Sequence, residues 1–286
     1  MKKRAGLLLI VISVSLFVSA QNKHNFRVAT YNIRLETPAD SGARAWQNRK
    51  FDVARLIHNY KFDIIGVQEV GSASQEADLK KLIPEFSYFG KGRDSQDGKK
   101  GEQIAVFFRT NRYKILEKGS FFLSETPEIM SKGWDADFRR MCVWTKLHDC
   151  KNQLDFYVFC THFDHIAKKA RIESAALIIN RIKNVAGNSP AILLGDLNSS
   201  PMDTTMYKNL TDFMTDTAVS AAEKLIPTAG TFNGFDMKTL DFPASQKIDY
   251  IFVRKINALN YRVINDKFND LSYPSDHFPL MCEVSF

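Results

Sequence analysis

The sequence predicts an α/β fold in which helices pack against β-sheets. From Phe26 onward, short runs rich in β-branched and aromatic residues, typical of strands, alternate with longer stretches of helical periodicity. No shift in composition divides this part of the chain into two domains. Because a strand or helix with one apolar face must bury that face against another element, we expect a single domain built of stacked layers.

Eight strands and three helices account for this alternation. The expected strands are residues 27–33, 64–68, 104–108, 141–147, 154–160, 191–194, 248–253 and 280–284, and the expected helices are residues 49–60, 76–82 and 168–185. In the last helix, Ile172 and Ile179 share one face, which predicts that this face is buried against a sheet. Glycine-rich or polar stretches at 90–101, 131–140 and 228–246 indicate surface loops, which either serve a site or act as mobile linkers.

The first 20 residues have the pattern of a cleavable secretory signal. Basic residues at positions 2–4 precede an apolar run at 7–18, and small residues lead to a cleavage point after Ala20. A membrane anchor is the alternative, but Ser13 and Ser15 interrupt the run, which is shorter than the roughly 20 residues of a spanning helix. We therefore expect a signal peptide at 1–20 and one domain at 21–286, exported to the periplasm or outside the cell without an integral membrane anchor.

The charge of the chain argues against a dedicated nucleic-acid binder. The formal net charge is +7, and it falls to +4 when the three basic residues of the signal peptide are removed. A mildly basic protein suits an anionic substrate, whereas a nucleic-acid binder usually carries a strongly basic face.

The four cysteines match no metal-binding spacing. Cys142, Cys160 and Cys282 lie in apolar runs, where a cysteine is usually a small buried apolar residue, and Cys150 lies in a polar turn. We expect structural thiols, and the sequence leaves a disulfide open.

Polar residues stand where apolar strands end or are interrupted. These residues are Asn32, Glu69, His162, Asp196, Asn198, Asp249, Asp276 and His277. Each alone has an ordinary explanation, such as a turn, a cap or a hydrogen-bonded core histidine. Buried carboxylates and imidazoles are costly unless they are paired or bind a metal, so their joint occurrence at strand ends predicts one convergent site.

Seven segments carry a resemblance to a known family. They are TYNIR at 30–34, IIGVQEV at 64–70, GEQIAVFFR at 101–109, THFDH at 161–165, LLGDLNSSP at 193–201, KIDYIFV at 247–253 and YPSDHFPL at 273–280. This ordered set resembles the endonuclease/exonuclease/phosphatase superfamily of metal-dependent phosphoester hydrolases, and the stretch 88–127 is similar to an exported bacterial branch. The resemblance implies two mixed β-sheets packed face to face in a sandwich, with helices on the outer faces and the site at one edge.

The resemblance also implies a metal site. Glu69 would be the principal ligand, with Asn32 and Asp276 completing or supporting the site. Carboxylate and amide oxygens are the ligands that Mg²⁺ prefers, and they suit Mn²⁺ as well. We therefore expect Mg²⁺ or Mn²⁺ as cofactor.

The same resemblance implies the catalytic residues. Asp196 and Asn198 would contact the attacking water and a phosphate oxygen. His277, oriented by Asp249, would act as general base or stabilise the transition state, and it stays open whether His277 or Asp196 takes the proton of the water. His162 would face the scissile phosphate, and Glu102 would hold its imidazole.

Five further residues are weaker candidates. Arg140, Lys168, Lys169 and Arg171 either bind further phosphate oxygens or form a solvated charged face, and Trp134 either stacks on a substrate ring or anchors a loop by packing.

The sequence thus predicts an exported, divalent-metal-dependent phosphodiesterase or phosphomonoesterase that acts on a compact anionic substrate. A nonspecific extracellular nuclease is the alternative, with nucleic acid as a possible but less favoured substrate. A catalytically inactive binding module is a third reading, but every expected polar position of the site is filled.

Overall fold

The computed structural model describes residues 25–268 and 272–286, so the expected signal peptide lies outside the described residues. The strands are β1 (Phe26–Asn32), β2 (Ile64–Val70), β3 (Phe86–Gly92), β4 (Gln103–Arg109), β5 (Tyr113–Phe122), β6 (Met141–Asp149), β7 (Leu154–His162), β8 (Ala191–Asp196), β9 (Thr215–Asp216), β10 (Glu223–Leu225), β11 (Asp249–Arg254), β12 (Asn257–Val263) and β13 (Leu280–Ser285). The α-helices are α1 (Trp46–Asn59), α2 (Ala73–Leu82), α3 (Lys168–Ala186), α4 (Thr204–Thr211) and α5 (Thr217–Ser220), and two 3₁₀ turns are η1 (Gly42–Arg44) and η2 (Ala244–Gln246).

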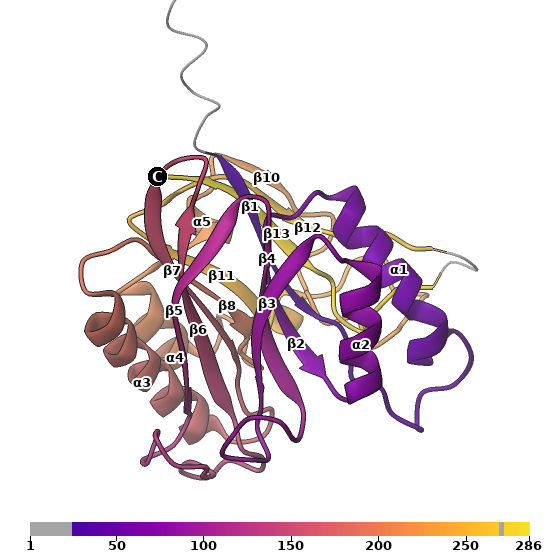
Figure 1. Cartoon of the computed structure of the whole chain (residues 1–286). Coiled ribbons are helices and arrows are strands. Elements are labelled where there is room, and N and C mark those ends of the chain that lie inside the picture. The colour runs from indigo at the N-terminus through magenta and orange to yellow at the C-terminus, as the bar shows by residue number, and fades with distance from the viewer. Residues whose placement is uncertain (1–24, 269–271) are drawn as a thin grey trace, which may run out of the picture.

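The strands form two mixed sheets packed against each other. One sheet has seven strands in the order β10-β12-β13-β1-β2-β4-β3, and the other has six in the order β5-β6-β7-β8-β11-β9. Within them β1 pairs parallel with β2, and β7 pairs parallel with β8. Helices α1 and α2 lie on one side of the molecule and α3 and α4 on the other (Figure 1). This architecture confirms the predicted α/β sandwich with helices on the outer faces.

The alternation of side chains along the strands builds three apolar layers. Val28 of β1 and Ile192 of β8 belong to the core between the sheets. Tyr31, on the opposite face of β1, packs with residues of α1, and Leu193 of β8 packs with residues of α3. Because successive side chains of a strand point to opposite faces, one strand serves both the inner core and a helical layer.

The two sheets lie close together where β2 faces β8. Gly66 of β2 lies against β8, where a Cβ atom at position 66 would be 2.7 Å from Cβ of Leu194 and 3.2 Å from Sγ of Cys160. A side chain at this position would push the sheets apart. Glycine therefore keeps the ends of β2 and β8 close together.

All eight predicted strands and all three predicted helices are present, with ends shifted by up to three residues. The helix expected at 49–60 begins at Trp46, and β3 extends into the stretch that was expected as a loop, to Gly92. The prediction missed the short elements β9, β10, α4 and α5. It also missed β3, β5 and β12, because most of their residues are at least partly exposed, so that neither a continuous apolar run nor a clear alternation marks them. All four cysteines are unpaired.

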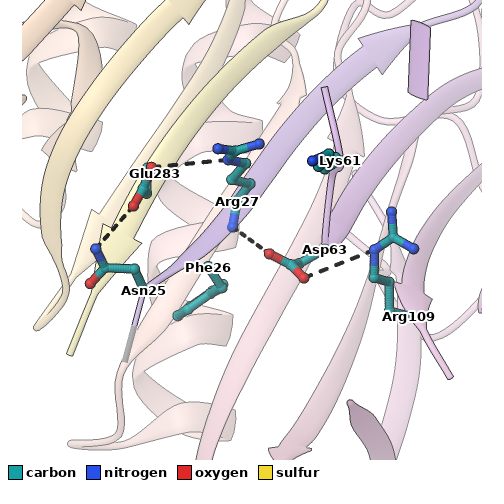
Figure 2. A pocket seen from close by; sticks show the side chains of 7 residues that line it. All are labelled: Asn25, Phe26, Arg27, Lys61, Asp63, Arg109 and Glu283. Atoms are coloured by element: carbon teal, nitrogen blue, oxygen red, sulfur yellow. Dashed lines mark hydrogen bonds and ion pairs between the residues drawn. The ribbon is translucent and has the colours of Figure 1, made fainter. Parts of the chain in front are cut away.

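A polar pocket lies where β1 begins, at the end of this strand away from Asn32. Its volume is about 560 Å³, and it is lined by Asn25, Phe26, Arg27, Lys61, Asp63, Arg109 and Glu283. The carboxylate of Asp63 accepts from the backbone N–H of Arg27 at 2.8 Å and lies 4.0 Å from Nε of Arg109. Nε of Arg27 lies 4.0 Å from Oε2 of Glu283 (Figure 2). Among the described residues, no helix is both long enough and apolar enough to cross a membrane.

Candidate active site

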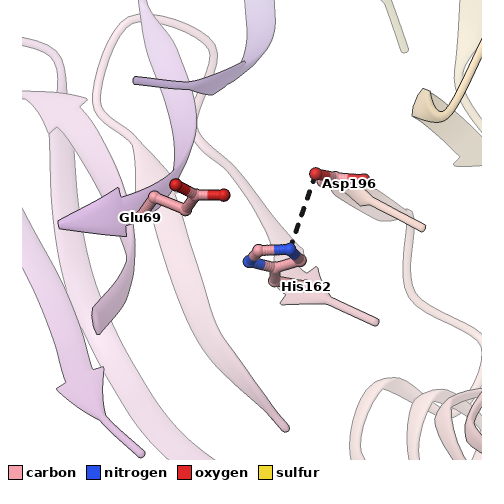
Figure 3. A group of neighbouring side chains, drawn as sticks. All are labelled: Glu69, His162 and Asp196. Atoms are coloured by element: carbon pink, nitrogen blue, oxygen red, sulfur yellow. Dashed lines mark ion pairs between the residues drawn. The ribbon is translucent and has the colours of Figure 1, made fainter. Parts of the chain in front are cut away.

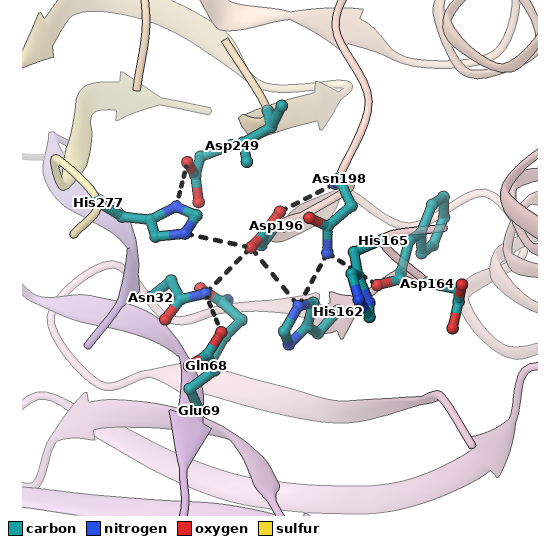
Figure 4. Close-up of polar contacts among 12 residues, drawn as sticks. Asn32, Gln68, Glu69, His162, Asp164, His165, Asp196, Asn198, Asp249 and His277 are labelled. Carbon is teal, nitrogen blue, oxygen red and sulfur yellow. Dashed lines mark hydrogen bonds and ion pairs between the residues drawn. The ribbon is translucent and has the colours of Figure 1, made fainter. Parts of the chain in front are cut away.

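The predicted site residues converge at one end of the sandwich. They come from the ends of β1, β2, β7, β8 and β11 and from the segments before β4 and β13, and they are Asn32, Glu69, Glu102, His162, Asp196, Asn198, Asp249, Asp276 and His277. Figure 4 shows most of these side chains directed toward one another. The convergence confirms the expected position of the site at one edge of the sandwich.

Asn32 links the two sheets through its amide. Its Nδ2 donates to Glu69 Oε1 at 2.9 Å and to Asp196 Oδ2 at 3.0 Å, and its Oδ1 accepts from the backbone N–H of Arg34 at 3.0 Å. The backbone carbonyl of Asn32 accepts from Ser275 Oγ at 2.7 Å. One buried amide therefore holds two carboxylates from different sheets side by side.

The backbone directs Glu69 into the site. Glu69 has a left-handed conformation, with φ of 64°, at a point where the pairing of β2 with β4 is irregular, between Val67 and Val70. Such irregularities bend a strand and change the direction of a side chain, and a non-glycine residue with positive φ is often found at a functional site. The second oxygen of Glu69, Oε2, accepts from the N–H of Leu35 at 3.1 Å, which fixes the carboxylate.

Asp276 is buried next to Glu69. Burial raises the pKa of Asp276 and the negative charge of Glu69 adds to the increase, whereas His277 and Arg34 oppose it. Nη1 of Arg34 lies 3.6 Å from Oδ2 of Asp276. The two carboxylates are therefore crowded, which is the charge distribution that a bound cation would relieve.

His277 forms a histidine–carboxylate pair. Its Nδ1 lies 2.9 Å from Oδ2 of Asp249, and the same oxygen accepts from Thr231 Oγ1 at 2.6 Å. This leaves Nε2 of His277 facing Asp196 Oδ2 at 3.7 Å. Burial opposes a charge on His277, but the negative charges of Asp249, Asp196 and Asp276 outweigh it and raise its pKa to about 10.

His162 forms the second pair. Its Nδ1 lies 3.1 Å from Glu102 Oε1, and its Nε2 accepts from Asn198 Nδ2 at 3.0 Å. Burial acts to raise the pKa of Glu102, but His162, Arg93 and Arg140 together lower it to about 2. Both predicted histidine–carboxylate pairs are thus within hydrogen-bonding reach, while the catalytic roles stay predictions.

Asp196 lies at the centre of these contacts. Two groups among the described residues have possible ligand atoms within 4.8 Å of one another, namely Glu69 with His162 and Asp196, and Asp196 with Asp249 and His277. Figure 3 shows Glu69, His162 and Asp196 pointing toward the same space. The oxygen donors of Glu69 and Asp196, with Asn32 and Asp276 beside them, fit a hard divalent cation better than a structural zinc ion, which favours cysteine and histidine.

A pocket of about 450 Å³ opens over these residues. Besides the predicted residues, its lining contains Arg34, Leu35, Arg93, Phe138, Arg140, His165, Phe232 and Ile248. Sequence reasoning gave no role to Arg34, Arg93 or Phe138. Arg34 and Arg93 could have been found, because they lie within or beside the segments TYNIR and GKGRDS, but nothing in the sequence distinguishes Phe138 from a core residue.

The five weaker candidates from the sequence lie in different parts of the structure. Arg140 lines the pocket, whereas Lys168, Lys169 and Arg171 do not, so three of the four basic candidates are not pocket residues. They belong to α3, in which Lys168 Nζ lies 3.7 Å from Asp203 Oδ1. Trp134 packs against a small cluster of Ala136, Ala167 and Ala170 and is a loop anchor.

Comparison with known proteins gives the same assignment. The model of the Endonuclease/Exonuclease/phosphatase family matches residues 29–277. An endonuclease/exonuclease/phosphatase family protein of Bacteroides thetaiotaomicron is 38% identical, with a TM-score of 0.86 over 92% of this chain and 98% of that one. A mannosyl-6-phosphatase of Bacteroides thetaiotaomicron VPI-5482 is 37% identical, with a TM-score of 0.85 over 91% of this chain and 100% of that one.

A more distant relative is human nocturnin, which is 23% identical over 85% of this chain. The chain spans 59% of the length of nocturnin. The order of the motifs, the two-sheet sandwich and the family match agree, and the chain belongs to the endonuclease/exonuclease/phosphatase family.

Proposed function

We propose that the chain is a divalent-metal-dependent hydrolase that cleaves the phosphoester bond of a compact phosphorylated substrate. The observation that carries the proposal is the arrangement around Asp196. Its carboxylate shares the amide of Asn32 with Glu69, and its Oδ2 lies 3.5 Å and 3.7 Å from Nε2 of His162 and His277. Oxygen donors for a cation therefore adjoin two oriented imidazoles, as hydrolysis of an anionic ester requires.

Glu69 and Asp196 are the residues that would hold Mg²⁺ or Mn²⁺, with Asn32 and Asp276 in support. When bound, the cation supplies positive charge that offsets the developing negative charge on the phosphate. Asn32 holds the carboxylates of Glu69 and Asp196 close together, because its Nδ2 donates a hydrogen bond to both.

The two histidines contribute from the other side of the pocket. The pKa of His277 is raised to about 10, so its imidazolium form is favoured at neutral pH and suits donation of a hydrogen bond to a phosphate oxygen. Asp196 is then the group that accepts the proton of the attacking water. Asn198, whose Nδ2 contacts Nε2 of His162, orients the second imidazole toward the phosphate.

The size of the pocket favours a small substrate. A pocket of about 450 Å³ can hold a phosphorylated metabolite. A nucleic-acid duplex would instead need a long basic surface on the protein. The similarity to a mannosyl-6-phosphatase at 37% identity supports a phosphorylated sugar as the kind of compound to test first.

An activity screen tests the proposal. Purified protein would be assayed with Mg²⁺ or Mn²⁺ against sugar phosphates, a phosphodiester, single-stranded RNA and plasmid DNA, and each assay would be repeated in excess EDTA. We expect release of phosphate from a small ester, loss of release in EDTA and recovery when metal is added back. Full turnover in EDTA would reject the metal-dependent mechanism, and plasmid nicking stronger than any small-ester hydrolysis would favour the nuclease alternative.

We also propose that the protein is exported after cleavage of residues 1–20, on the basis of the sequence pattern alone. Fractionation of the producing cells followed by mass spectrometry of the purified chain tests this. A chain in the cell envelope or medium that begins at Gln21 is expected, and an intact N-terminus in the cytosol would contradict export.

A further inference from the structure

Arg140 is a buried cation with unused hydrogen-bond donors. It precedes β6, is only 6% exposed and lines the pocket. Among the described residues, its Nε and Nη1 have no hydrogen-bond partner. Because a guanidinium has five N–H donors and loses its hydration on burial, a buried arginine whose donors stay unpaired is costly unless a ligand completes it.

The carboxylates near Arg140 are already occupied. Glu102 Oε1 lies 3.5 Å from Nη1 of Arg140 but takes closer contacts from Arg93 Nη1 at 3.0 Å and His162 Nδ1 at 3.1 Å. Asp164 Oδ2 lies 3.9 Å from Nε of Arg140 and instead accepts from two backbone N–H groups, while Oδ1 accepts from two more. Neither carboxylate therefore satisfies the guanidinium.

Two neighbouring side chains extend this part of the pocket. The guanidinium of Arg93 lies 5.1 Å from the ring centroid of Phe138, and that of Arg140 lies 5.9 Å from it. Phe138 is 44% exposed although it is a large apolar residue, and it stacks on His165 with ring centroids 5.7 Å apart. Two cations thus flank an exposed aromatic ring inside the pocket.

This group stands apart from the proposed metal ligands. A chain of contacts leads from Arg140 toward Asp196. Oε1 of Glu102 lies 3.5 Å from Nη1 of Arg140, Nδ1 of His162 faces Glu102, and Nε2 of His162 faces Asp196. A phosphate held at Asp196 would contact the Nε2 edge of His162. The two arginines contact Glu102, on the Nδ1 side of the same imidazole.

We propose that Arg93, Arg140 and Phe138 form a second anion-binding subsite, which recognises a second phosphate or carboxylate on the substrate. The inference rests on the proposed hydrolysis in the same pocket, and it narrows the substrate to small phosphoesters with two anionic groups. Arginine suits this role because its planar group pairs with two oxygens at once. The exposed ring of Phe138 offers an apolar face to the body of the substrate.

A selectivity experiment tests the subsite. The value of kcat/KM with Mg²⁺ would be measured for a hexose monophosphate, the corresponding hexose bisphosphate and a phosphorylated sugar acid that carries a carboxylate. We expect the wild-type protein to prefer one or both of the compounds with two anionic groups, and we expect R140M to lower that preference by about tenfold or more, the scale of a lost charge-assisted hydrogen bond. Comparison of the hexose bisphosphate with the phosphorylated sugar acid shows whether the subsite prefers a phosphate or a carboxylate.

Matched variants separate recognition from structure. R93M, at a less buried position, should lower the same preference, and R140K should retain part of it. R34M removes a pocket arginine beside Asp276, so it should lower turnover of all three compounds and leave their ratio unchanged. A wild-type protein without preference, or R140M and R93M variants that keep the wild-type ratio, would overturn the inference.

A binding measurement distinguishes failure of the subsite from failure of the proposed function. Isothermal titration in EDTA follows binding of the bisphosphate without metal-dependent turnover. If wild-type protein hydrolyses no phosphoester, the proposed function fails, and the titration alone decides the subsite. Binding that R140M and R93M weaken at least several-fold would support the subsite, and equal binding by wild type and both variants would reject it.

Discussion

Both ends of β1 lie beside polar pockets, but their carboxylates have different neighbours. At its beginning, opposite charges face each other, as Arg109 faces Asp63 and Arg27 faces Glu283 (Figure 2). At its end, Asn32 lies among carboxylates of like charge, including Glu69 and Asp196 (Figure 4). Polar residues at the end of one strand are therefore not by themselves evidence of an active site. Carboxylates of like charge that converge from several strands are such evidence.

The difference has a physical consequence for the stability of each end. Paired surface charges add little to the free energy of unfolding, but they also cost little. Crowded buried carboxylates oppose folding and persist where function requires them, or where a bound cation offsets them. Substitution should therefore abolish turnover at the end near Asn32 and leave turnover nearly unchanged at the end near Asp63.

The largest effect is expected at Glu69. The variant E69A should reduce metal-dependent turnover to near background, by roughly 10²–10³-fold or more, because it removes a charged group that holds the cation. In EDTA its melting temperature should equal or exceed that of the wild type, since one of two crowded carboxylates is gone. Phosphate release and thermal unfolding, each with and without Mg²⁺, measure both effects. A stable E69A protein with normal turnover would contradict the proposal that the carboxylates at the end of β1 hold the cation.

The next largest effect is expected at the two histidines. H277A and H162A should each reduce kcat by roughly 10²–10⁴-fold, the scale of a positioned acid–base group. His148 offers a matched control, because its Nδ1 lies 2.7 Å from Asp155 Oδ1 in a pair that does not line the pocket. H148A should leave kcat unchanged. If H277A kept the wild-type kcat, as expected for H148A, the histidine–carboxylate pair of His277 would have no catalytic role.

A smaller effect is expected at Arg49, a residue of α1 that is 2% exposed. Its guanidinium donates to the backbone carbonyls of Ile33 and Arg34, the latter at 2.6 Å, and to that of Pro274 at 3.2 Å. It thereby ties the segment after Asn32 to the segment before Asp276. R49M would leave these carbonyls without their donor and should cost about 1–3 kcal/mol of stability.

Turnover of R49M should also fall, by roughly 10–100-fold, the range for residues that orient metal ligands. The apparent affinity for Mg²⁺, obtained from metal titration of activity, should weaken, and R49K should recover part of it. A purely structural role would lower stability without changing the affinity of the remaining folded protein for Mg²⁺.

The sequence predicted more of the site than of the sheet edges, for a physical reason. Glu69 and Asp196 interrupt strands that are otherwise buried, so their cost on burial is visible as a break in an apolar run. Edge strands such as β5 are largely exposed and carry no such signal. The position of Phe138 depends on how a loop folds over the pocket, which neither periodicity nor composition records.

That Arg93 and Arg140 lie beside the same carboxylate, Glu102, was not predicted from the sequence. Arg140 was a candidate together with three basic residues of α3, and only the fold separates them, because Arg140 enters the pocket while α3 covers the outer face of the six-stranded sheet. Arg93 meets Glu102 across a turn that brings the end of β3 beside the start of β4. Contacts of this kind follow from strand pairing.

The smallest effect is expected at the other end of β1, for the variant D63N. Asparagine keeps an oxygen that can accept from the N–H of Arg27, and Asp63 does not line the active-site pocket, so turnover should stay within about twofold of the wild type. Burial raises the pKa of Asp63 although Arg112 and Arg109 oppose the increase. The neutral form is therefore the one that folding favours, and its contribution is complete below the unfolded pKa of about 3.9 and is lost as the pH rises through the folded pKa.

It follows that D63N, which has no carboxyl to ionise, should gain stability relative to the wild type as the pH rises above the unfolded pKa of about 3.9. Urea unfolding of both proteins at several pH values measures this difference. A variant that instead loses stability as the pH rises would mean that the ion pairs with Arg109 and Arg112, at 4.0 Å and 3.6 Å, outweigh burial. A large loss of turnover would mean that the two ends of β1 are coupled.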